Sequence, residues 1–471
     1  MEVEGTATVP EVVADGNSFL LGQHDDYVTQ VAVIPTISDS EPSAFDVLSA
    51  GIDGILRCHS VVLQEGSATT TQTWEVLKEN FPLQAMATAS NFGHSLVAVG
   101  GMGHKIHLLI RDRAKWVPLL VLATRKPVSA LLIHSDSAQK KRESGHGVHW
   151  GVSVFAASQD KEVHRFTVST CPLGLLAAVE RTYGLNLPRL PLVLSRDEKE
   201  GSEWVVTVTG SVSITGHTDH VRSVAMAPVT EGGEHYLGSA SDDGLVKRSN
   251  SASVFAQVWK MSTLTEQHVC EGHLDDVLSL SMDFYTPQKP IIVSGGKDRT
   301  LRIWGEGTSR AATPIACLAT LRLPAVARCI VTTKPQEGET YGDVIVGCGD
   351  GQVRQWRYVK ERRQEEQHHT VAIEAPKATK QRKGAKRGKR RQSGNAMDVE
   401  EPAATTTTTT IREWVEAKWV LVKSVHVHRE SIASIALVDA HLEEQQQAQL
   451  QPTSLIVITG ANEGSVQLTR L

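Results

Sequence analysis

A turn motif that recurs seven times constrains this chain of 471 residues more than any other feature. In each copy a strand-like apolar run ends in a small residue, and the turn position follows four residues later. The clearest copy is VSGGKDRTLRIW, in which Asp298 follows Ser294 by four positions and Trp304 follows Asp298 by six. The seven turn positions are Asp53, Gly103, Asp160, Asp243, Asp298, Asp350 and Glu463. Repetition of this kind predicts a fold built from one repeated supersecondary unit.

A second marker lies upstream of the better copies, where a histidine precedes Val or Ile by four positions. The four pairs are His24/Val28, His217/Val221, His273/Val277 and His428/Ile432. Together the two markers resemble the WD repeat, a unit of four short strands with a period of about 40 to 45 residues. GHLDDV followed by SGGKDRTLRIW is the strongest copy and GHTDHV followed by SASDDG is good, whereas the other five are degenerate. The intervals exceed the usual period, so we expect insertions between or within the repeats.

The resemblance implies an all-β fold, a seven-bladed WD-repeat β-propeller, over most of the chain from about residue 20 onward. The last copy, SIASIALVD, LIVITGANEG and SVQLTRL, supplies three strands, and the segment NSFLLGQH near residue 20 can supply the fourth. A ring closed by the two ends of the chain leaves only short, protected strand edges. We therefore expect residues 1–16 to be a tail and residues 17–471 to be one propeller with insertions.

The resemblance also implies a structural role for the marker residues. In a WD repeat whose strands run a to d from the centre outward, the histidine of the d–a turn bridges the carboxylate of the b–c turn and a hydroxyl on strand b. That hydroxyl reaches an indole N–H on strand c, so each buried polar group has a partner. The residues expected in these tetrads are His273, Ser294, Asp298 and Trp304, with His217, Ser239 and Asp243 in the preceding blade.

Blade four departs from the pattern after its turn. The apolar-Trp pair that should follow SASDDG arrives ten residues late, at Val258 and Trp259. If strand c is broken there, Trp259 cannot take its usual place relative to Asp243. A bulged-out loop would restore that place, and an error in the gene model is a third alternative.

The most strongly charged segment is an insertion at about 359–412, and we expect it to be disordered because it is low in complexity and poor in apolar residues. Its run KATKQRKGAKRGKRR, residues 377–391, has nine Lys or Arg and no acid. Such a run is typical of a nuclear-import signal or a phosphate contact with RNA, and the alternative is a solvated spacer. The central cations are Lys383, Lys386, Arg387, Lys389, Arg390 and Arg391.

Two further insertions are expected. In the insertion 169–203, LGLLAAVERTYGL can form a short helix that Pro188 and Pro191 end, and we favour packing against the propeller over a partner-binding patch. Residues 135–148 are typical of an ordinary polar loop.

No enzyme motif is present, so we predict no catalytic residues, no cofactor, no small-molecule substrate and no metal site. GxGxxG, GxxxxGK[ST], GxSxG and HExxH patterns are absent, as are Cys/His clusters at zinc spacing. His368 and His369 fall in the charged insertion, and His428 is already a repeat marker. No run of 18 apolar residues appears, which argues against a membrane span. An acidic N-terminus and six scattered cysteines favour an intracellular protein, nuclear or cytoplasmic.

Binding of other proteins remains as the expected activity, through turns held on a rigid ring. Acids in the d–a turns would suit a partner with a basic segment, although such acids are equally common as turn formers. The candidate partner-binding residues are Tyr27, Asp219, His220, Asp275, Asp276 and Arg299. We therefore predict a non-catalytic scaffold subunit of a multiprotein, nuclear or RNA-related complex.

The alternative is an accessory, RNA-contacting subunit of a tRNA-modifying complex, or a ribosome-assembly factor. The order HDDYV, LSAGIDG, NFGHSLVAVGGMGHKIHLLI and AASQDKEVHRFTV is similar to the first propeller of the WD subunit of Elongator. The Lys-rich appendage resembles those on the non-catalytic WD subunit of the tRNA guanine-N7 methyltransferase and on ribosome-assembly propellers. RNA would then bind through the basic insertion.

Overall fold

A computed structural model provides the structure of this chain. It describes residues 18–35, 44–64, 67–91, 94–112, 115–135, 151–172, 189–192, 204–227, 236–243, 254–260, 265–286, 289–306, 315–335, 341–372, 405–438 and 455–471. The predicted tail, 1–16, and nearly all of the predicted loop at 135–148 lie outside these residues.

All regular structure in the described residues is β-strand, arranged in seven antiparallel sheets. Six sheets have four strands and the remaining one has five. Blades one to three contain, from strand a outward, β2 (Val28–Pro35), β3 (Ala44–Gly51), β4 (Ile55–Gln64) and β5 (Ser67–Lys78); β6 (Leu83–Asn91), β7 (His94–Gly101), β8 (Lys105–Asp112) and β9 (Lys115–Ala123); and β10 (Val128–Ser135), β11 (Gly151–Ser158), β12 (Glu162–Pro172), β14 (Trp204–Thr215) and β13 (Arg189–Leu192).

The other four blades each have four strands. Blades four to seven contain β15 (Val221–Met226), β16 (Tyr236–Ser241), β17 (Val254–Lys260) and β18 (Thr265–His273); β19 (Val277–Thr286), β20 (Lys289–Gly296), β21 (Thr300–Glu306) and β22 (Ile315–Arg322); β23 (Ala327–Thr332), β24 (Val344–Cys348), β25 (Gln352–Ala372) and β26 (Thr405–His426); and β27 (Ile432–Leu437), β28 (Ile456–Ala461), β29 (Ser465–Arg470) and β1 (Ser18–Gln23).

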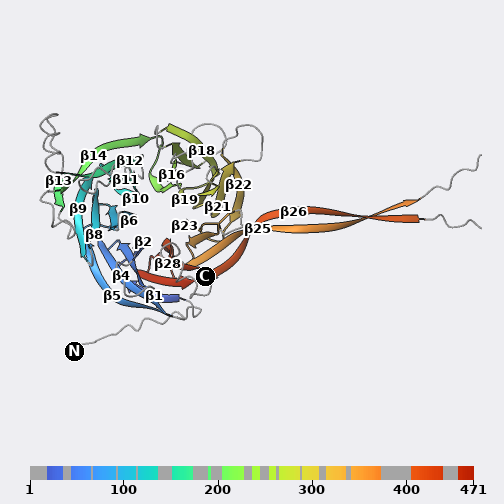
Figure 1. The fold of residues 1–471 in the computed structure, drawn as a ribbon, viewed down its shortest axis with the longest axis horizontal. Coiled ribbons are helices and arrows are strands. Elements are labelled where there is room, and N and C mark those ends of the chain that lie inside the picture. Colours follow the sequence, from blue (N-terminus) through green and yellow to red (C-terminus); the bar gives the residue numbers. More distant parts are fainter. Residues whose placement is uncertain are drawn as a thin grey trace, which may run out of the picture. The chain divides into compact units, whose positions relative to one another are not determined.

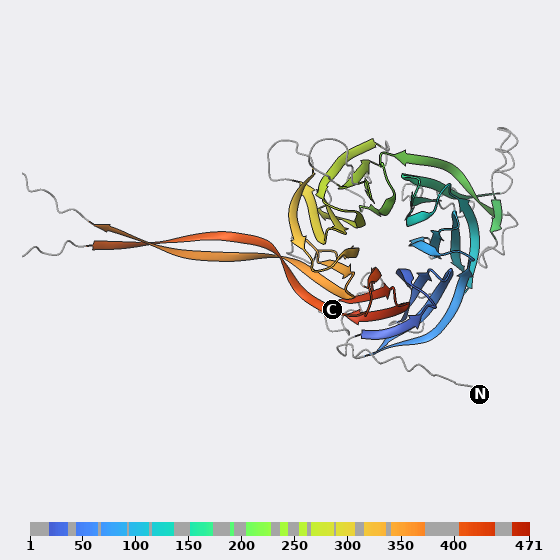
Figure 2. The same ribbon diagram turned by 180° about the vertical axis from the view of Figure 1, so that it is seen from behind.

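The blades follow one another around a centre that is lined by strand a of each sheet. Figure 1 and, from behind, Figure 2 show this circular order. Each innermost strand contacts the innermost strands of the two neighbouring blades, and β27 contacts β2. The all-β propeller expected from the repeats is therefore confirmed.

The two ends of the described chain meet in blade seven, as the sequence predicted. Strand β1 pairs with β29 in antiparallel register, with Ser18 opposite Thr469. Their hydroxyl groups are hydrogen-bonded at 3.0 Å although 451 positions separate the two residues. The ring is thus closed by backbone pairing between remote segments.

Seven clusters of buried apolar side chains hold the ring together, one at each junction between neighbouring blades. At the junction of blades seven and one, for example, Val28 and Val31 pack with Ile458 and Val466. Every residue of strand β11 is buried because blades on both sides cover it. Burial on both faces explains why the b strands have apolar runs instead of alternating patterns.

The b–c turns share one backbone conformation. In six blades the residue after the turn position has a positive φ, which favours glycine. These residues are Gly54, His104, Lys161, Arg299, Gly351 and Gly464. The equivalent residue in blade four lies outside the described residues.

Strand c of blade four is intact. Its backbone register gives Trp259 its usual place, as the bulged-loop alternative predicted. Leu237 of β16 pairs with Trp259 of β17, as Ile292 pairs with Trp304 in blade five. The ten additional residues, 244–253, lie outside the described residues, between the turn and β17.

The insertion expected at 169–203 is more regular than predicted. Strand β12 runs through Thr170 to Pro172, and β13 adds a fifth strand to the outer edge of blade three. Pro191 was expected to end a helix, but it lies in β13 opposite Val205. An edge strand tolerates proline because one side of the strand needs no backbone donor. The segment predicted to be helical, 173–185, is outside the described residues.

The expectation of disorder across 359–412 is wrong at both ends of that segment. A second compact unit, Tyr358–Lys418, contains the distal parts of β25 and β26, whose strands are paired. Consecutive β-branched residues, Thr405 to Ile411, favour strand there. The basic run 377–391 belongs to residues 373–404, which are not described.

Within the part of the chain that the structure describes, we find no helix with the length and apolar character of a membrane span. The five cysteines whose side chains are described are free thiols.

Candidate functional site

The most conspicuous polar constellation is a buried set in blade five that brings together the four predicted tetrad residues. His273, at the end of β18, lies 2.9 Å from Asp298 Oδ2 through Nδ1 and 2.8 Å from Ser294 Oγ through Nε2. Trp304 Nε1 donates to the same Ser294 oxygen at 2.8 Å. A consistent direction runs from the indole N–H to the serine, from the serine O–H to the imidazole, and from the imidazole N–H to the carboxylate.

Blades four and seven repeat this arrangement with small changes. His217 contacts Asp243 at 2.7 Å and Ser239 at 2.8 Å. In blade seven, His428 uses Glu463 at 2.7 Å and Thr459 at 2.8 Å. Glu463 was already one of the predicted turn positions, whereas the Thr459 hydroxyl was not predicted; the contacts are equivalent to those of blade five.

These sets resemble a hydrolytic Ser-His-Asp triad only in composition. Ser294 is fully buried and Trp304 is 2% exposed, so a substrate has no access to the hydroxyl. Burial would raise the pKa of Asp298, but hydrogen bonds from His273 and the Leu274 N–H outweigh it and hold that pKa far below its usual range. The Ser294 oxygen also accepts a hydrogen bond from the Trp304 indole at 2.8 Å, and His273 is only 1% exposed. The arrangement stabilises the blade and supplies no nucleophile.

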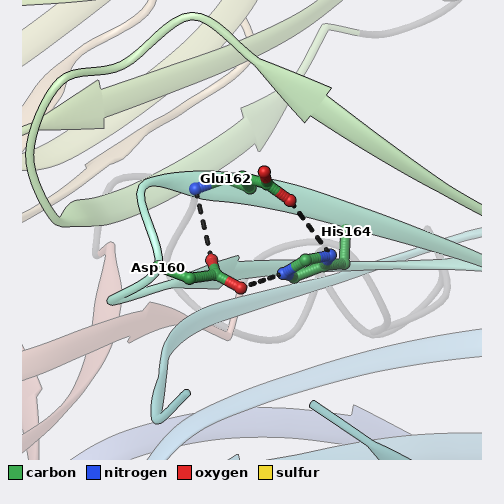
Figure 3. Close-up of side chains that lie close together, drawn as sticks. All are labelled: Asp160, Glu162 and His164. Carbon is green, nitrogen blue, oxygen red and sulfur yellow. Dashed lines mark hydrogen bonds and ion pairs between the residues drawn. The ribbon is translucent and has the colours of Figure 1, made fainter. Parts of the chain in front are cut away.

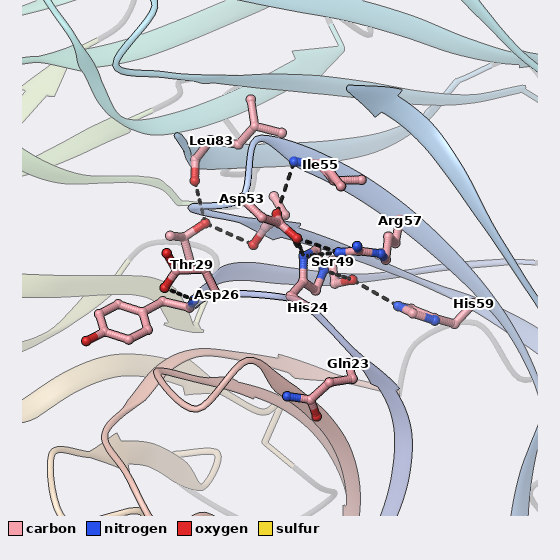
Figure 4. Close-up of polar contacts among 12 residues, drawn as sticks. Gln23, His24, Asp26, Thr29, Ser49, Asp53, Ile55, Arg57, His59 and Leu83 are labelled. Carbon is pink, nitrogen blue, oxygen red and sulfur yellow. Dashed lines mark hydrogen bonds and ion pairs between the residues drawn. The ribbon is translucent and has the colours of Figure 1, made fainter. Parts of the chain in front are cut away.

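Blade one replaces the tryptophan by a second histidine (Figure 4). His24 contacts Asp53 at 2.9 Å and Ser49 at 2.8 Å, and Ser49 contacts Nε2 of His59 at 2.9 Å. Nδ1 of His59 is 3.0 Å from the Thr73 hydroxyl. Neutral His59 therefore provides the N–H that the indole provides in blade five. Burial lowers the pKa of His59 to about 4, and the nearby His24 and Arg57 act in the same direction.

Blades three and six have no histidine before strand a, and a side chain of strand c takes its place. His164 contacts Asp160 at 2.7 Å and the Ser213 hydroxyl at 2.9 Å. In blade six, Arg354 donates to both oxygens of Asp350 at 3.0 and 2.6 Å. In both blades the cationic or imidazole side chain follows the aspartate by four positions. Sequence reasoning missed this substitution, although the spacing is visible in DKEVH and DGQVR.

Asp160, Glu162 and His164 also form the one metal-like group that we find among the described residues (Figure 3). Their donor atoms all lie within 4.8 Å of one another. Both nitrogens of His164 are already hydrogen-bonded, to Asp160 and to Ser213. A cation would have to displace one of these bonds, so the geometry fits a blade-stabilising contact better than a metal centre.

The six candidate partner-binding residues all lie in d–a or b–c turns, which the antiparallel topology places at the same end of every blade. Tyr27 is 45% exposed. Leu274 and Met102, which the sequence analysis did not select, lie in turns at the same end and are 75% and 42% exposed. The missed signal was an apolar residue directly beside a marker, at GHLDD and GGMGH. Arg299 is exposed at the turn of blade five.

The acids at this end act first as turn formers. Asp26, Asp219 and Asp275 each accept a hydrogen bond at 2.8 Å from the backbone N–H of the next residue. Asp276 is also paired with Lys297, and His220 is only 3.9 Å from Asp219. Both interpretations of the acids therefore stand. The acids shape the turns, and Asp26, Asp219 and Asp275 have no Lys or Arg partner among the described residues.

The six predicted cations of the basic run, from Lys383 to Arg391, lie outside the described residues. The histidine pair 368–369 falls in β25, in a part whose side chains are not described.

Comparisons with known proteins agree with this geometry. The family profile "WD domain, G-beta repeat" matches residues 264–305, the segment that contains the blade five tetrad. The crystal structure of the RRP9 WD40 repeats is similar over 97% of this chain and 98% of that chain, with a TM-score of 0.51 and 13% sequence identity. The "Ubiquitin homeostasis protein lub1" of Schizosaccharomyces pombe is 34% identical over 142 residues, which are 30% of this chain and 15% of that protein. The chain therefore matches only a small part of that relative.

Proposed function

Because this chain is a WD-repeat β-propeller protein, we propose that it is a non-catalytic scaffold that binds other proteins. The binding surface is the end of the blades at which the d–a and b–c turns lie, here called the turn end. The observation that carries this proposal is the contrast between two kinds of residues. The side chains of the tetrads are buried and hydrogen-bonded to one another, while Tyr27, Leu274 and Met102 are exposed in turns. Tyrosine is enriched among the few residues that supply most of an interface's binding energy, and methionine is enriched at interfaces relative to the rest of the surface.

A second argument concerns the rigidity of these turns. Tyr27 follows an aspartate that fixes its backbone N–H, and its carbonyl accepts a hydrogen bond from Ile52 at 2.9 Å. Leu274 is held by its N–H, which donates to Asp298 Oδ2 at 3.0 Å. Side chains on a preorganised backbone lose less conformational freedom when they bind, so they are suited to recognition.

Purification of the tagged full-length chain from its own cells, followed by identification of stoichiometric partners, tests the proposal. We expect the double substitution Tyr27→Ala, Leu274→Ser to release a partner that the original chain retains. The matched control is Val212→Ser, because Val212 is also 45% exposed but lies on the outer strand β14. Loss of the partner in the control, or no stoichiometric partner at all, contradicts the assignment to the turn end.

RNA contact is the second candidate, and the nine cations of residues 377–391 favour it. We propose it for an accessory subunit of a nuclear, RNA-related complex such as a tRNA-modifying one. A single-stranded RNA that contacted all nine cations would bind with a log–log salt slope of up to about −6. Filter binding of RNA to the full chain and to a chain without residues 377–391, at several salt concentrations, separates the two roles. Unchanged affinity together with altered location in the cell would instead indicate an import signal.

A further inference from the structure

The centre of the propeller contains a cavity of about 170 Å³ to which all seven innermost strands contribute. Each strand provides at least one lining residue near its start, which in five of the strands is the second residue. These residues are Gln30, Met86, Ser129, Arg222, Leu278, Arg328 and Ala433. None of the buried tetrads reaches this space, so its chemistry is independent of the blade-stabilising contacts.

The charges that line the cavity are all positive. Its lining includes the guanidinium groups of Arg222 and Arg328 and no Asp or Glu. Arg222 is compensated from outside the lining, because Asp242 accepts its Nε–H at 2.6 Å. Arg328 is half-buried, and across the described ranges it has no hydrogen bond or ion pair with any side chain. One cation of the cavity is therefore neutralised and the other is not.

Two further polar side chains of the cavity, Ser129 and Gln30, have hydrogen-bond donors without a partner among the described residues. The hydroxyl oxygen of Ser129 is shielded from solvent and has no partner in the described part of the chain. Ser434 donates to the amide oxygen of Gln30 at 3.3 Å, which leaves the amide N–H groups of Gln30 as donors. A partly desolvated guanidinium without a counter-ion is costly, and an anion in the same cavity would accept from it and from these unused donors.

From this uncompensated positive charge and these unused donors we infer that the central cavity binds a small oxyanion of the phosphate class, with Arg328 as its principal cationic ligand. A volume of about 170 Å³ has room for a phosphate group. Arg328 presents a planar fork that matches phosphate oxygens in a bidentate manner. The inference is separate from the protein-binding role of the turn end.

Isothermal titration of the full-length chain with inorganic phosphate, in a chloride buffer at neutral pH, tests this inference. A second titration with a short phosphoserine peptide distinguishes a free ion from a phosphate group carried by a partner. We expect saturable binding of one of these ligands, weakened at least about tenfold by Arg328→Gln. Arg328→Lys, which keeps the charge but not the fork, should lose less than Arg328→Gln.

The matched control is Arg125→Gln, because Arg125 is exposed in a d–a turn and does not line the cavity. Unchanged binding in this variant, with the melting temperature of each variant within a few degrees of the original, supports the assignment. The inference is overturned if neither ligand binds saturably up to millimolar concentrations. It is also overturned if Arg328→Gln and Arg125→Gln bind as the original chain does.

Discussion

Acidification from pH 7 to pH 5 should destabilise this protein through His59, and substitution His59→Gln should remove that part of the pH dependence. His59 is fully buried, and its pKa is lowered from 6.5 to about 4, chiefly by burial. Glutamine stays neutral over this range and can still bond the hydroxyls of Ser49 and Thr73. The substitution therefore isolates the titration of one imidazole.

The sign and the size of the effect follow from linkage. Below pH 6.5 the unfolded chain binds a proton at residue 59 while the folded chain does not, so protons favour unfolding and stability falls as the pH falls. The stability is complete above the unfolded pKa and is lost progressively toward pH 4. With pKa values of 6.5 and about 4, the loss between pH 7 and pH 5 is about 2 kcal/mol. The full loss, reached below pH 4, is roughly 3.4 kcal/mol.

Urea unfolding followed by tryptophan fluorescence at pH 7 and pH 5 measures this difference. We expect the original chain to lose about 2 kcal/mol more stability between the two pH values than the His59→Gln chain does. The pKa of His24 is also lowered by burial, so acid destabilises both chains, and the prediction concerns the difference between them. An equal loss in both chains, or an imidazole at residue 59 that titrates near pH 6.5 by NMR, would refute the reasoning.

Two further substitutions test the packing of the ring by thermal unfolding. Arg111 of β8 forms an ion pair across the blade boundary with the fully buried Asp46, so Arg111→Met leaves that carboxylate without its cation and should lower the free energy of unfolding by about 3 to 5 kcal/mol. The double substitution Arg111→Met, Asp46→Leu should recover most of that loss. If it does not, the loss is not due to an uncompensated buried charge. Gly351→Ala places a Cβ 1.9 Å from the His428 carbonyl oxygen at a φ of 74° and should cost at least about 1 to 3 kcal/mol. Gly210→Ala, whose Cβ would find its nearest neighbour at 3.8 Å, should be close to neutral, and equal melting temperatures for the two glycine variants would contradict the prediction.

The fold was predictable because its determinants are local and repeated. The turn motif, the histidine marker and the missing fourth strand of the last repeat were sufficient to predict that β1 completes blade seven, which is confirmed. The place of Trp259 was open from the sequence, because the insertion could break or preserve strand c. Pairing between β16 and β17 determines the outcome, and that pairing depends on neighbours that no local pattern encodes.

Two features were not predictable: a strand that depends on pairing with another segment, and turn carboxylates whose hydrogen-bond donor comes from strand c instead of the preceding turn. Strand β13 has only four residues and forms because β14 offers it an open edge, not because its own sequence favours strand. The roles of His164 and Arg354 were missed because a carboxylate in a turn can be satisfied from strand c as well as from the preceding turn. What the blade requires is a donor near the carboxylate, and the sequence position of that donor can vary.

The pairing of β1 with β29 has a consequence for how the protein is made. At about 5 to 20 residues per second, a ribosome needs tens of seconds to synthesise the 451 positions between Ser18 and Thr469. Throughout that interval β1, including Leu20 with its largely apolar neighbours, is a nascent strand whose partner does not yet exist. Completion of blade seven must therefore follow the synthesis of β29, and β1 stays without its strand partner until then.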